Sequence, residues 1–250
     1  MSSEQGFYLT LPSNASMSLH PGNTLTKYIT ALPQRVRLEG QWECGLVEIQ
    51  YPHSWYNVRR ENAWFAVVSR SDHSFIRRGH IETGYYDRPE KLIGAINEIL
   101  KNDGVGQGVT LTYSKITQKV TARLDPGVVF SMDMHNILGF DGPFLTETAE
   151  AQSVVDMAQG FYSLYVYTNV VEPRVVGDTV VPLLRIVPLT GRHGAMVSKS
   201  FDNVQYVPVL HKEFGTVEVD IRDDAGRSVP FERGKVTVTL HFRRRKPSLF

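Results

Sequence analysis

The chain has little cysteine: Cys44 is the single example in 250 residues. This excludes an intrachain disulfide framework and a metal cluster of the Cys-x-x-Cys type, and it is typical of proteins that fold in a reducing compartment. The eight histidines occur singly, without the His-x-His or His-Glu-x-x-His spacing that places two metal ligands on one face. We therefore expect no metal site and no cofactor.

Long hydrophobic runs and a charge bias are also missing. No stretch approaches the roughly 18 unbroken apolar residues of a membrane-spanning helix, and residues 1–11 lack the apolar core of a secretory signal. The chain carries 27 basic against 26 acidic residues, so overall charge does not indicate a nucleic-acid partner. These absences predict a soluble protein without a membrane span that is not secreted through a signal peptide.

Catalytic motifs are absent as well. No Gly-x-Ser-x-Gly elbow occurs, and the glycine-rich residues 104–108 lead from a predicted helix into a strand, the reverse of a phosphate-binding loop. Cys44 stands in a predicted strand near Glu43 and Glu48. That setting has neither the helix N-terminus nor the cation that lowers the pKa of a catalytic thiol. We expect Cys44 to be a small buried hydrophobe in a protein that is not an enzyme.

Two-residue alternation is abundant. Near the C-terminus, Val236, Val238, Leu240 and Phe242 alternate with polar residues, as in a strand with one buried face. Further strands are expected at residues 6–11, 25–31, 42–51, 63–69, 109–113, 119–124, 160–171, 181–187, 205–210 and 216–222. Prolines cluster near the ends of these runs, where a missing N–H does not interrupt a ladder. Many short strands separated by turn signals predict an all-β sandwich or barrel.

The segment 42–51 is apolar first on one face and then on the other. Cys44 falls on the first face, whereas Ile49 and Tyr51 fall on the second. Such a change of face predicts either a β-bulge, near Gly45, or a strand that is covered on both sides.

Two segments have helical spacing. Asp87 is placed to cap a helix, with Pro89 in its first turn and Glu90 three residues on. The apolar residues that follow at helical spacing are Leu92, Ile93, Ile96, Ile99 and Leu100. A shorter helix is expected over residues 132–138. Since no internal repeat or linker occurs, we predict one domain, residues 1–250, with a helical insertion near 87–104 and a basic tail at 243–250.

Three stretches together resemble a viral family. They are residues 7–16 (FYLTLPSNAS), 42–57 (WECGLVEIQYPHSWYN) and 229–243 (VPFERGKVTVTLHFR). The sequence is similar there to the minor capsid protein, or penton, of Polinton (Maverick) elements and the related adintoviruses. The resemblance implies a single jelly-roll β-sandwich with loop-rich extensions, which forms a homopentamer at each icosahedral vertex beside a double jelly-roll major capsid protein. It also implies a virion protein that is made inside the host cell.

A closed ring of identical subunits uses a heterologous interface, in which one patch meets a different one. Such interfaces are rich in aromatic residues and arginine. The candidate subunit-interface residues are Trp55, Tyr56, Trp64, Tyr85 and Tyr86. For each of them, burial in the core is the alternative.

The basic run near the C-terminus is a candidate contact with nucleic acid or with neighbouring capsomers. It consists of Arg243, Arg244, Arg245 and Lys246. Binding to packaged DNA would release counterions, whereas the simpler alternative is a solvated tail. For the whole chain, the alternative to a penton is a jelly-roll binding module that binds a receptor or a carbohydrate without catalysis.

Overall fold

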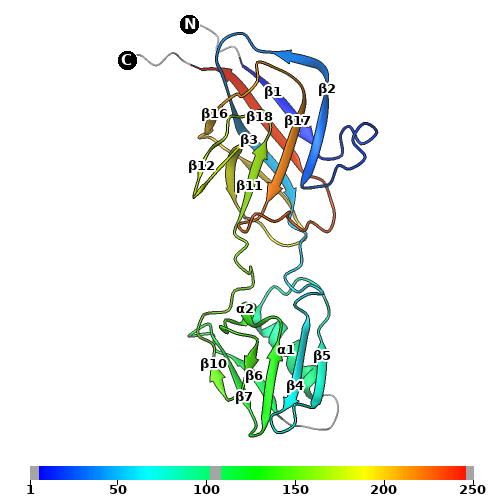
Figure 1. Cartoon of the computed structure of the whole chain (residues 1–250), viewed down its shortest axis with the longest axis vertical. Helices are drawn as coiled ribbons and strands as arrows, with labels where there is room; N and C mark the ends of the chain where they lie inside the picture. Colours follow the sequence, from blue (N-terminus) through cyan, green and yellow to red (C-terminus); the bar gives the residue numbers. More distant parts are fainter. Residues whose placement is uncertain (1–5, 102–107, 246–250) are drawn as a thin grey trace. The chain divides into compact units, whose positions relative to one another are not determined.

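The computed structural model describes residues 6–101 and 108–245. The chain divides into two compact units, one that contains the residues up to Trp55 and from Phe161 onward, and one that contains residues 56–160 (Figure 1). Each unit has a hydrophobic core of its own. The inserted segment is therefore longer than the helical insertion near 87–104 that the sequence indicated. The apolar face of the helix packs on strands that precede and follow it in the sequence, so the helix belongs to the core of the inserted unit.

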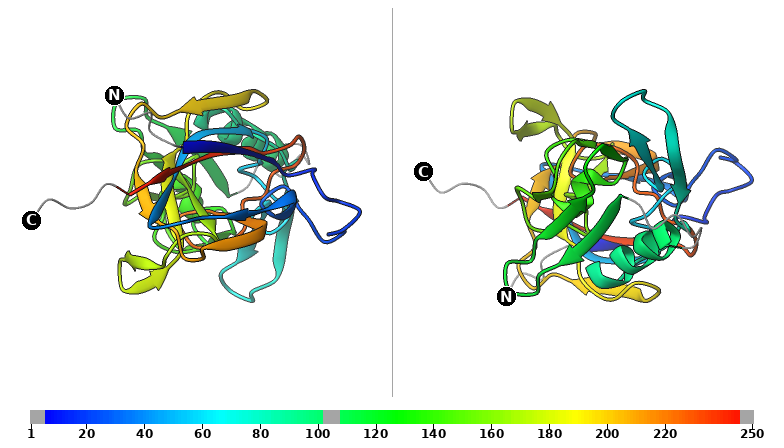
Figure 2. Two further views of the ribbon diagram at one scale, coloured as in Figure 1. Left: turned by 90° about the horizontal axis from the view of Figure 1, so that it is seen from above. Right: turned by 90° about the horizontal axis from the view of Figure 1, so that it is seen from below.

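The first unit is a sandwich of two antiparallel sheets (Figure 1). One sheet has the order β1 (Gly6–Pro12), β18 (Thr237–Arg244), β3 (Trp42–Pro52) and β15 (Met196–Ser200), and β16 (Tyr206–Pro208) also pairs with β3. The other has the order β14 (Leu183–Pro188), β11 (Ser163–Thr168), β17 (Glu213–Arg222) and β2 (Lys27–Arg37). In the left view of Figure 2, β1 and β2 lie in different layers. The core between the sheets takes residues from both.

The topology of this unit is that of a jelly roll. Its main strands in chain order are β1, β2, β3, β11, β14, β15, β17 and β18. Counted in that order, the sheets read 1-8-3-6 and 5-4-7-2. Such alternation between two antiparallel sheets is the arrangement of a double-sheet jelly roll. The predicted all-β, single jelly-roll sandwich is confirmed. Between β11 and β14, a hairpin is formed by β12 (Arg174–Val176) and β13 (Thr179–Val181).

Strand β3 changes face through a bulge. Glu48 pairs with Thr239 and Leu46 pairs with Leu240, so Val47 has no partner in the ladder with β18. One extra residue shifts the alternation by one position. This shift keeps the apolar side chains on both halves of the strand in the core, and it places the predicted bulge at Val47 rather than at Gly45.

The second unit combines two small sheets with a helix. One sheet has the order β5 (Phe75–His80), β4 (Trp64–Ser69), β8 (Val128–Met132) and β9 (Phe144–Leu145). The other has the order β10 (Ala149–Glu150), β7 (Val120–Leu124) and β6 (Val109–Tyr113). Helix α1 (Pro89–Lys101) packs on β6 and β5. The one-turn helix α2 (His135–Leu138) is shorter than the predicted 132–138, because Met132 belongs to β8.

Two polar side chains fix α1 to its neighbours. The amide of Asn97 donates to the carbonyl oxygen of Leu111 (2.8 Å) and accepts from the N–H of Leu111 (3.0 Å). A neighbouring strand would form the same pair of hydrogen bonds. Arg77 on β5 donates to the carbonyl oxygen of Ile99 (2.6 Å), near the end of the helix. The predicted helix is present over Pro89–Lys101, and the carboxylate of Asp87 lies 2.7 Å from Nζ of Lys91. Residues 102–104 of the predicted insertion lie outside the described residues.

Candidate interaction surfaces

The structure places the predicted interface residue Trp55 in the core of the first unit. Its side chain is 7% exposed, and its ring stacks on His53 (centroids 4.1 Å apart) and meets Phe161 edge-on (5.0 Å). Little of the ring is therefore available to a second subunit. Trp55 is thus a core residue, which was the alternative stated for every aromatic candidate.

The other four candidates belong to the second unit and differ in exposure. Trp64 is 49% exposed and Tyr85 is also exposed. Tyr56 and Tyr86 are half-buried, and the hydroxyl of Tyr86 donates to the carbonyl oxygen of Glu82 (2.9 Å). Trp64 and Tyr85 are thus the candidates with most surface available to a partner.

Trp64 lies on the solvent face of the sheet β5-β4-β8-β9. Along β4 it alternates with Phe65 and Val67, which point into the core of the unit. The face consists of Trp64, Ala66, Arg78, His80, Ser131 and Phe144, and we name it the Trp64 face. His80 packs edge-on against the indole (4.7 Å), and Phe144 is 68% exposed. Aromatic residues with arginine around a shallow pocket are typical of protein interfaces.

A second aromatic surface crosses the first unit. The ring of Tyr8 stacks on His241 (4.5 Å), and the Tyr206 hydroxyl lies 2.7 Å from Nδ1 of that histidine. The guanidinium of Arg243 lies 3.5 Å from the Tyr206 ring centroid. His241 and Tyr206 both pair with Gly45, whose missing side chain lets the two meet across β3. We name Tyr8, His241, Tyr206 and Arg243 the Tyr206 ladder. The Tyr206 ladder was not predicted from the sequence, because its residues are brought together by the register of four strands.

The members of the C-terminal basic run have different surroundings. Nε of Arg243 lies 2.6 Å from Oε1 of Glu43, so this guanidinium is held against the sheet. Arg244 and Arg245 are exposed. Lys246 lies outside the described residues. Within the described part of the run, Arg244 and Arg245 are therefore better placed than Arg243 to contact a partner.

Cys44 and the histidines are the side chains that the sequence offered for reactive or metal-binding chemistry. Cys44 is fully buried, and burial raises the pKa of its thiol, as expected for a core hydrophobe. Among the described residues, no three His, Cys, Asp or Glu side chains are grouped so that they would hold a metal ion. In the same residues, no helix has the length and apolar character to cross a membrane.

Acidification below about pH 6.5 should destabilise the first unit, through His53 and His193. Burial lowers the pKa of both imidazoles; His193 lowers that of His53 further, and Arg233 lowers that of His193 further. The unfolded chain therefore takes up protons at a higher pH than the folded chain. The free energy of unfolding should be constant with respect to these groups above about pH 6.5 and decrease as the pH falls through that value.

Urea unfolding at about pH 7.5, 6.5 and 5.5 measures this dependence. His193→Gln removes one of the two titrating groups, so its unfolding free energy should fall less over the same range. The explanation is wrong if the wild-type protein is equally stable at all three pH values or if the variant shows the full decrease.

The fold defines the class of this protein as an all-β jelly roll with an inserted second unit. A solved structure with a similar fold is that of the selenomethionine-labelled mavirus penton protein. The two share 13% sequence identity at a TM-score of 0.53, and the similarity covers 96% of this chain and 99% of the penton chain. At this identity, the likeness concerns the fold alone. No family model matches the sequence, and neither does any curated protein.

Proposed function

We propose that this chain is a penton, a minor capsid protein of a Polinton- or adintovirus-like shell, which forms pentamers at the icosahedral vertices. The observation that carries the proposal is the similarity of fold to the mavirus penton protein over nearly the full length of both chains. The resemblance of residues 7–16, 42–57 and 229–243 to the Polinton family points to the same role independently. In this role the protein acts through self-association and not through catalysis.

The described surfaces are suited to a closed ring. A heterologous interface needs two different patches on one protomer. The Trp64 face on the second unit and the Tyr206 ladder on the first are two such patches, and both combine aromatic rings with arginine, the residue types enriched at interface centres. Tyr56, Tyr85 and Tyr86 are further candidates for contacts between subunits.

The proposed role also implies partners and a location. The pentamer would sit in the virion, surrounded by a double jelly-roll major capsid protein, after synthesis inside the host cell. Arg244 and Arg245 would contact either packaged DNA or neighbouring capsomers. Contact with DNA would weaken steeply with added salt, since each phosphate contact releases counterions.

The mass of the purified protein in solution tests the proposal. We expect a species of about 141 kDa, five copies of the 28.2 kDa chain, in native mass spectrometry and ring-shaped particles in electron micrographs. Arg78→Glu on the Trp64 face should shift the mass toward the monomer, because it places a charge of the opposite sign at the centre of the patch. Glu147→Lys, at an exposed position outside both patches, serves as the control.

A stable dimer or trimer that the double jelly-roll protein does not convert to a pentamer would contradict the penton role. It would favour the alternative, a jelly-roll binding module without catalysis. Such a module would bind its ligand saturably as a small oligomer, whereas a penton assembles without one.

A further inference from the structure

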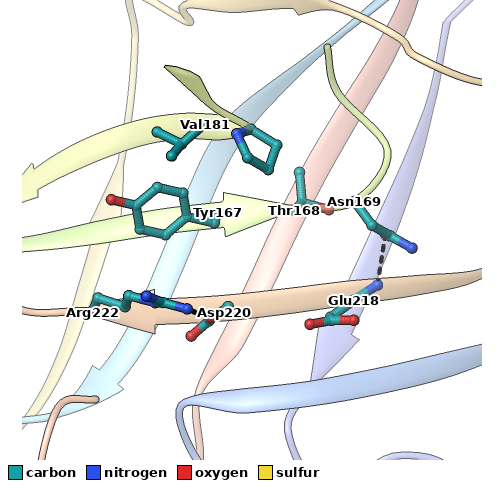
Figure 3. Close-up of a pocket in the computed structure, with 8 residues that line it drawn as sticks. Tyr167, Thr168, Asn169, Val181, Glu218, Asp220 and Arg222 are labelled. Atoms are coloured by element: carbon teal, nitrogen blue, oxygen red, sulfur yellow. Dashed lines mark hydrogen bonds and ion pairs between the residues drawn. The ribbon is translucent and has the colours of Figure 1, made fainter. Parts of the chain in front are cut away.

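The first unit has a pocket on the outward face of the sheet β14-β11-β17-β2. In the ladder between β11 and β17, Tyr167 pairs with Asp220, while the neighbouring pair Val166 and Ile221 points into the core. The pocket is lined by Tyr167, Thr168 and Asn169 at the end of β11, by Val181 and Pro182 before β14, and by Glu218, Asp220 and Arg222 on β17 (Figure 3). Its volume is about 240 Å³. None of these residues belongs to the surfaces described above.

The polar groups of the pocket are held in place and still have hydrogen-bonding capacity. Oδ2 of Asp220 accepts from both Nε (3.0 Å) and Nη2 (2.8 Å) of Arg222, and the aspartate is only 8% exposed. Among the described residues, this pair leaves Oδ1 of Asp220 as an acceptor and Nη1 of Arg222 as a donor. The amide oxygen of Asn169 accepts from the N–H of Glu218 (2.9 Å), and within residues 6–101 and 108–245 the amide nitrogen remains as a second donor.

The charges in and beside the pocket balance. Asp220 is paired with Arg222, and Oε1 of Glu218 lies 3.3 Å from Nζ of Lys27. An anionic ligand would approach two carboxylates, and a cationic ligand would compete with Arg222 for Asp220. Buried charges without a partner are costly. The pocket is therefore matched to a neutral ligand that both donates and accepts hydrogen bonds.

The pocket also offers apolar surface to a ligand. In Figure 3 the ring of Tyr167 lies between the Val181 wall and the Asp220–Arg222 pair. An aromatic face carries partial negative charge and attracts the weakly positive C–H groups of a ligand. The ligand must then present a flat face of C–H groups together with several hydroxyls. Pockets that bind drug-sized ligands have volumes of roughly 300–1,000 Å³, so this smaller pocket fits a single ring.

We propose that this pocket binds one neutral pyranose unit of a carbohydrate. The C–H face of the sugar stacks on Tyr167, its hydroxyls donate to Oδ1 of Asp220, and they accept from Nη1 of Arg222 and the amide of Asn169. The Val181–Pro182 wall closes one side of the ring. This inference does not depend on the penton role, because it rests on the pocket of one protomer.

Saturation-transfer NMR on the full chain tests it, with the methyl glycosides of glucose, galactose, mannose and N-acetylglucosamine as probes. At least one glycoside should receive saturation from the wild-type protein. Tyr167→Ala should weaken its binding by at least about tenfold, whereas Tyr167→Phe, which keeps the ring, should bind it as the wild type does. Tyr165→Ala is the matched control, since Tyr165 lies on the same face of β11 outside the pocket. The thermal midpoint of each variant shows that it is folded.

The proposal is overturned if none of the four glycosides is saturated, or if folded Tyr167→Ala binds within tenfold of the wild type. The mass of the same sample separates this result from the penton role. A pentamer that binds no glycoside overturns the sugar site alone, whereas a dimer whose glycoside binding requires Tyr167 supports the sugar site and contradicts the penton.

Discussion

Replacing Phe242 by alanine should lower the free energy of unfolding of the first unit by about 3–5 kcal/mol. Phe242 is fully buried on β18, which pairs with both β1 and β3. Its ring stacks parallel to that of Phe7 (centroids 4.9 Å apart) and lies 5.7 Å from that of Phe214 on the opposite sheet. The truncation removes buried apolar area and leaves a cavity between the sheets. Domains are typically stable by about 5–15 kcal/mol, so this change would remove much of the stability.

Urea unfolding followed by tryptophan fluorescence measures the loss, since Trp42 and Trp55 report on this unit. Thr10→Ala is the control, because Thr10 is exposed on the neighbouring strand β1 and its truncation should change the free energy of unfolding by only about 0.5 kcal/mol. Similar effects of the two substitutions would show that Phe242 does not have the packing described.

Replacing Gly139 by alanine should destabilise the second unit by about 2–4 kcal/mol while leaving the first unit folded. Gly139 ends helix α2 with φ +85, a conformation that is costly for residues with a Cβ. An added Cβ would also overlap the carbonyl oxygen of Ser153. The backbone is not free to move aside, since the Ser153 N–H donates to the carbonyl oxygen of Gly139 (2.9 Å).

Hydrogen exchange followed by mass spectrometry locates the effect. Peptides from residues 56–160 should lose protection, whereas those from β1, β3 and β18 should keep it, because the two units have separate cores. Gly142→Ala provides the control, since a Cβ there meets no atom within 4 Å. Loss of protection spread evenly over the chain would contradict the presence of two independent cores.

Local sequence patterns were sufficient to predict those strands and helices that bury one face. The alternation in 236–242 identified β18, and the spacing of Leu92, Ile93, Ile96 and Leu100 identified α1. Strand β5 was missed because FIRRGH shows no clear apolar alternation: Phe75 and Ile76 are both exposed and Gly79 leaves room for the Phe65 ring. Strand β8 was missed because VVFSM is a short apolar run, which periodicity alone does not distinguish from a buried helix.

The candidate surfaces were only partly predictable. Trp64 was identified by residue type, and the structure places it on an exposed sheet face. Trp55 was identified on the same basis and lies in a core. Nothing in the neighbouring sequence separates the two, because exposure depends on which distant segments pack on a side chain. The Tyr206 ladder and the Tyr167 pocket had no sequence signal for the same reason.

The all-β class, the position of α1 and the burial of Cys44 could be predicted from the amino-acid sequence, because these features follow from residue spacing over a few positions. The division into two units, the bulge at Val47 and the exposure of each aromatic residue became known only from the folded chain. These features depend on register between strands that are far apart in the chain: Tyr8 meets His241 only through the pairing of β1 with β18. Pairing of that kind is set by the packing of the whole unit, and it leaves no local pattern to read.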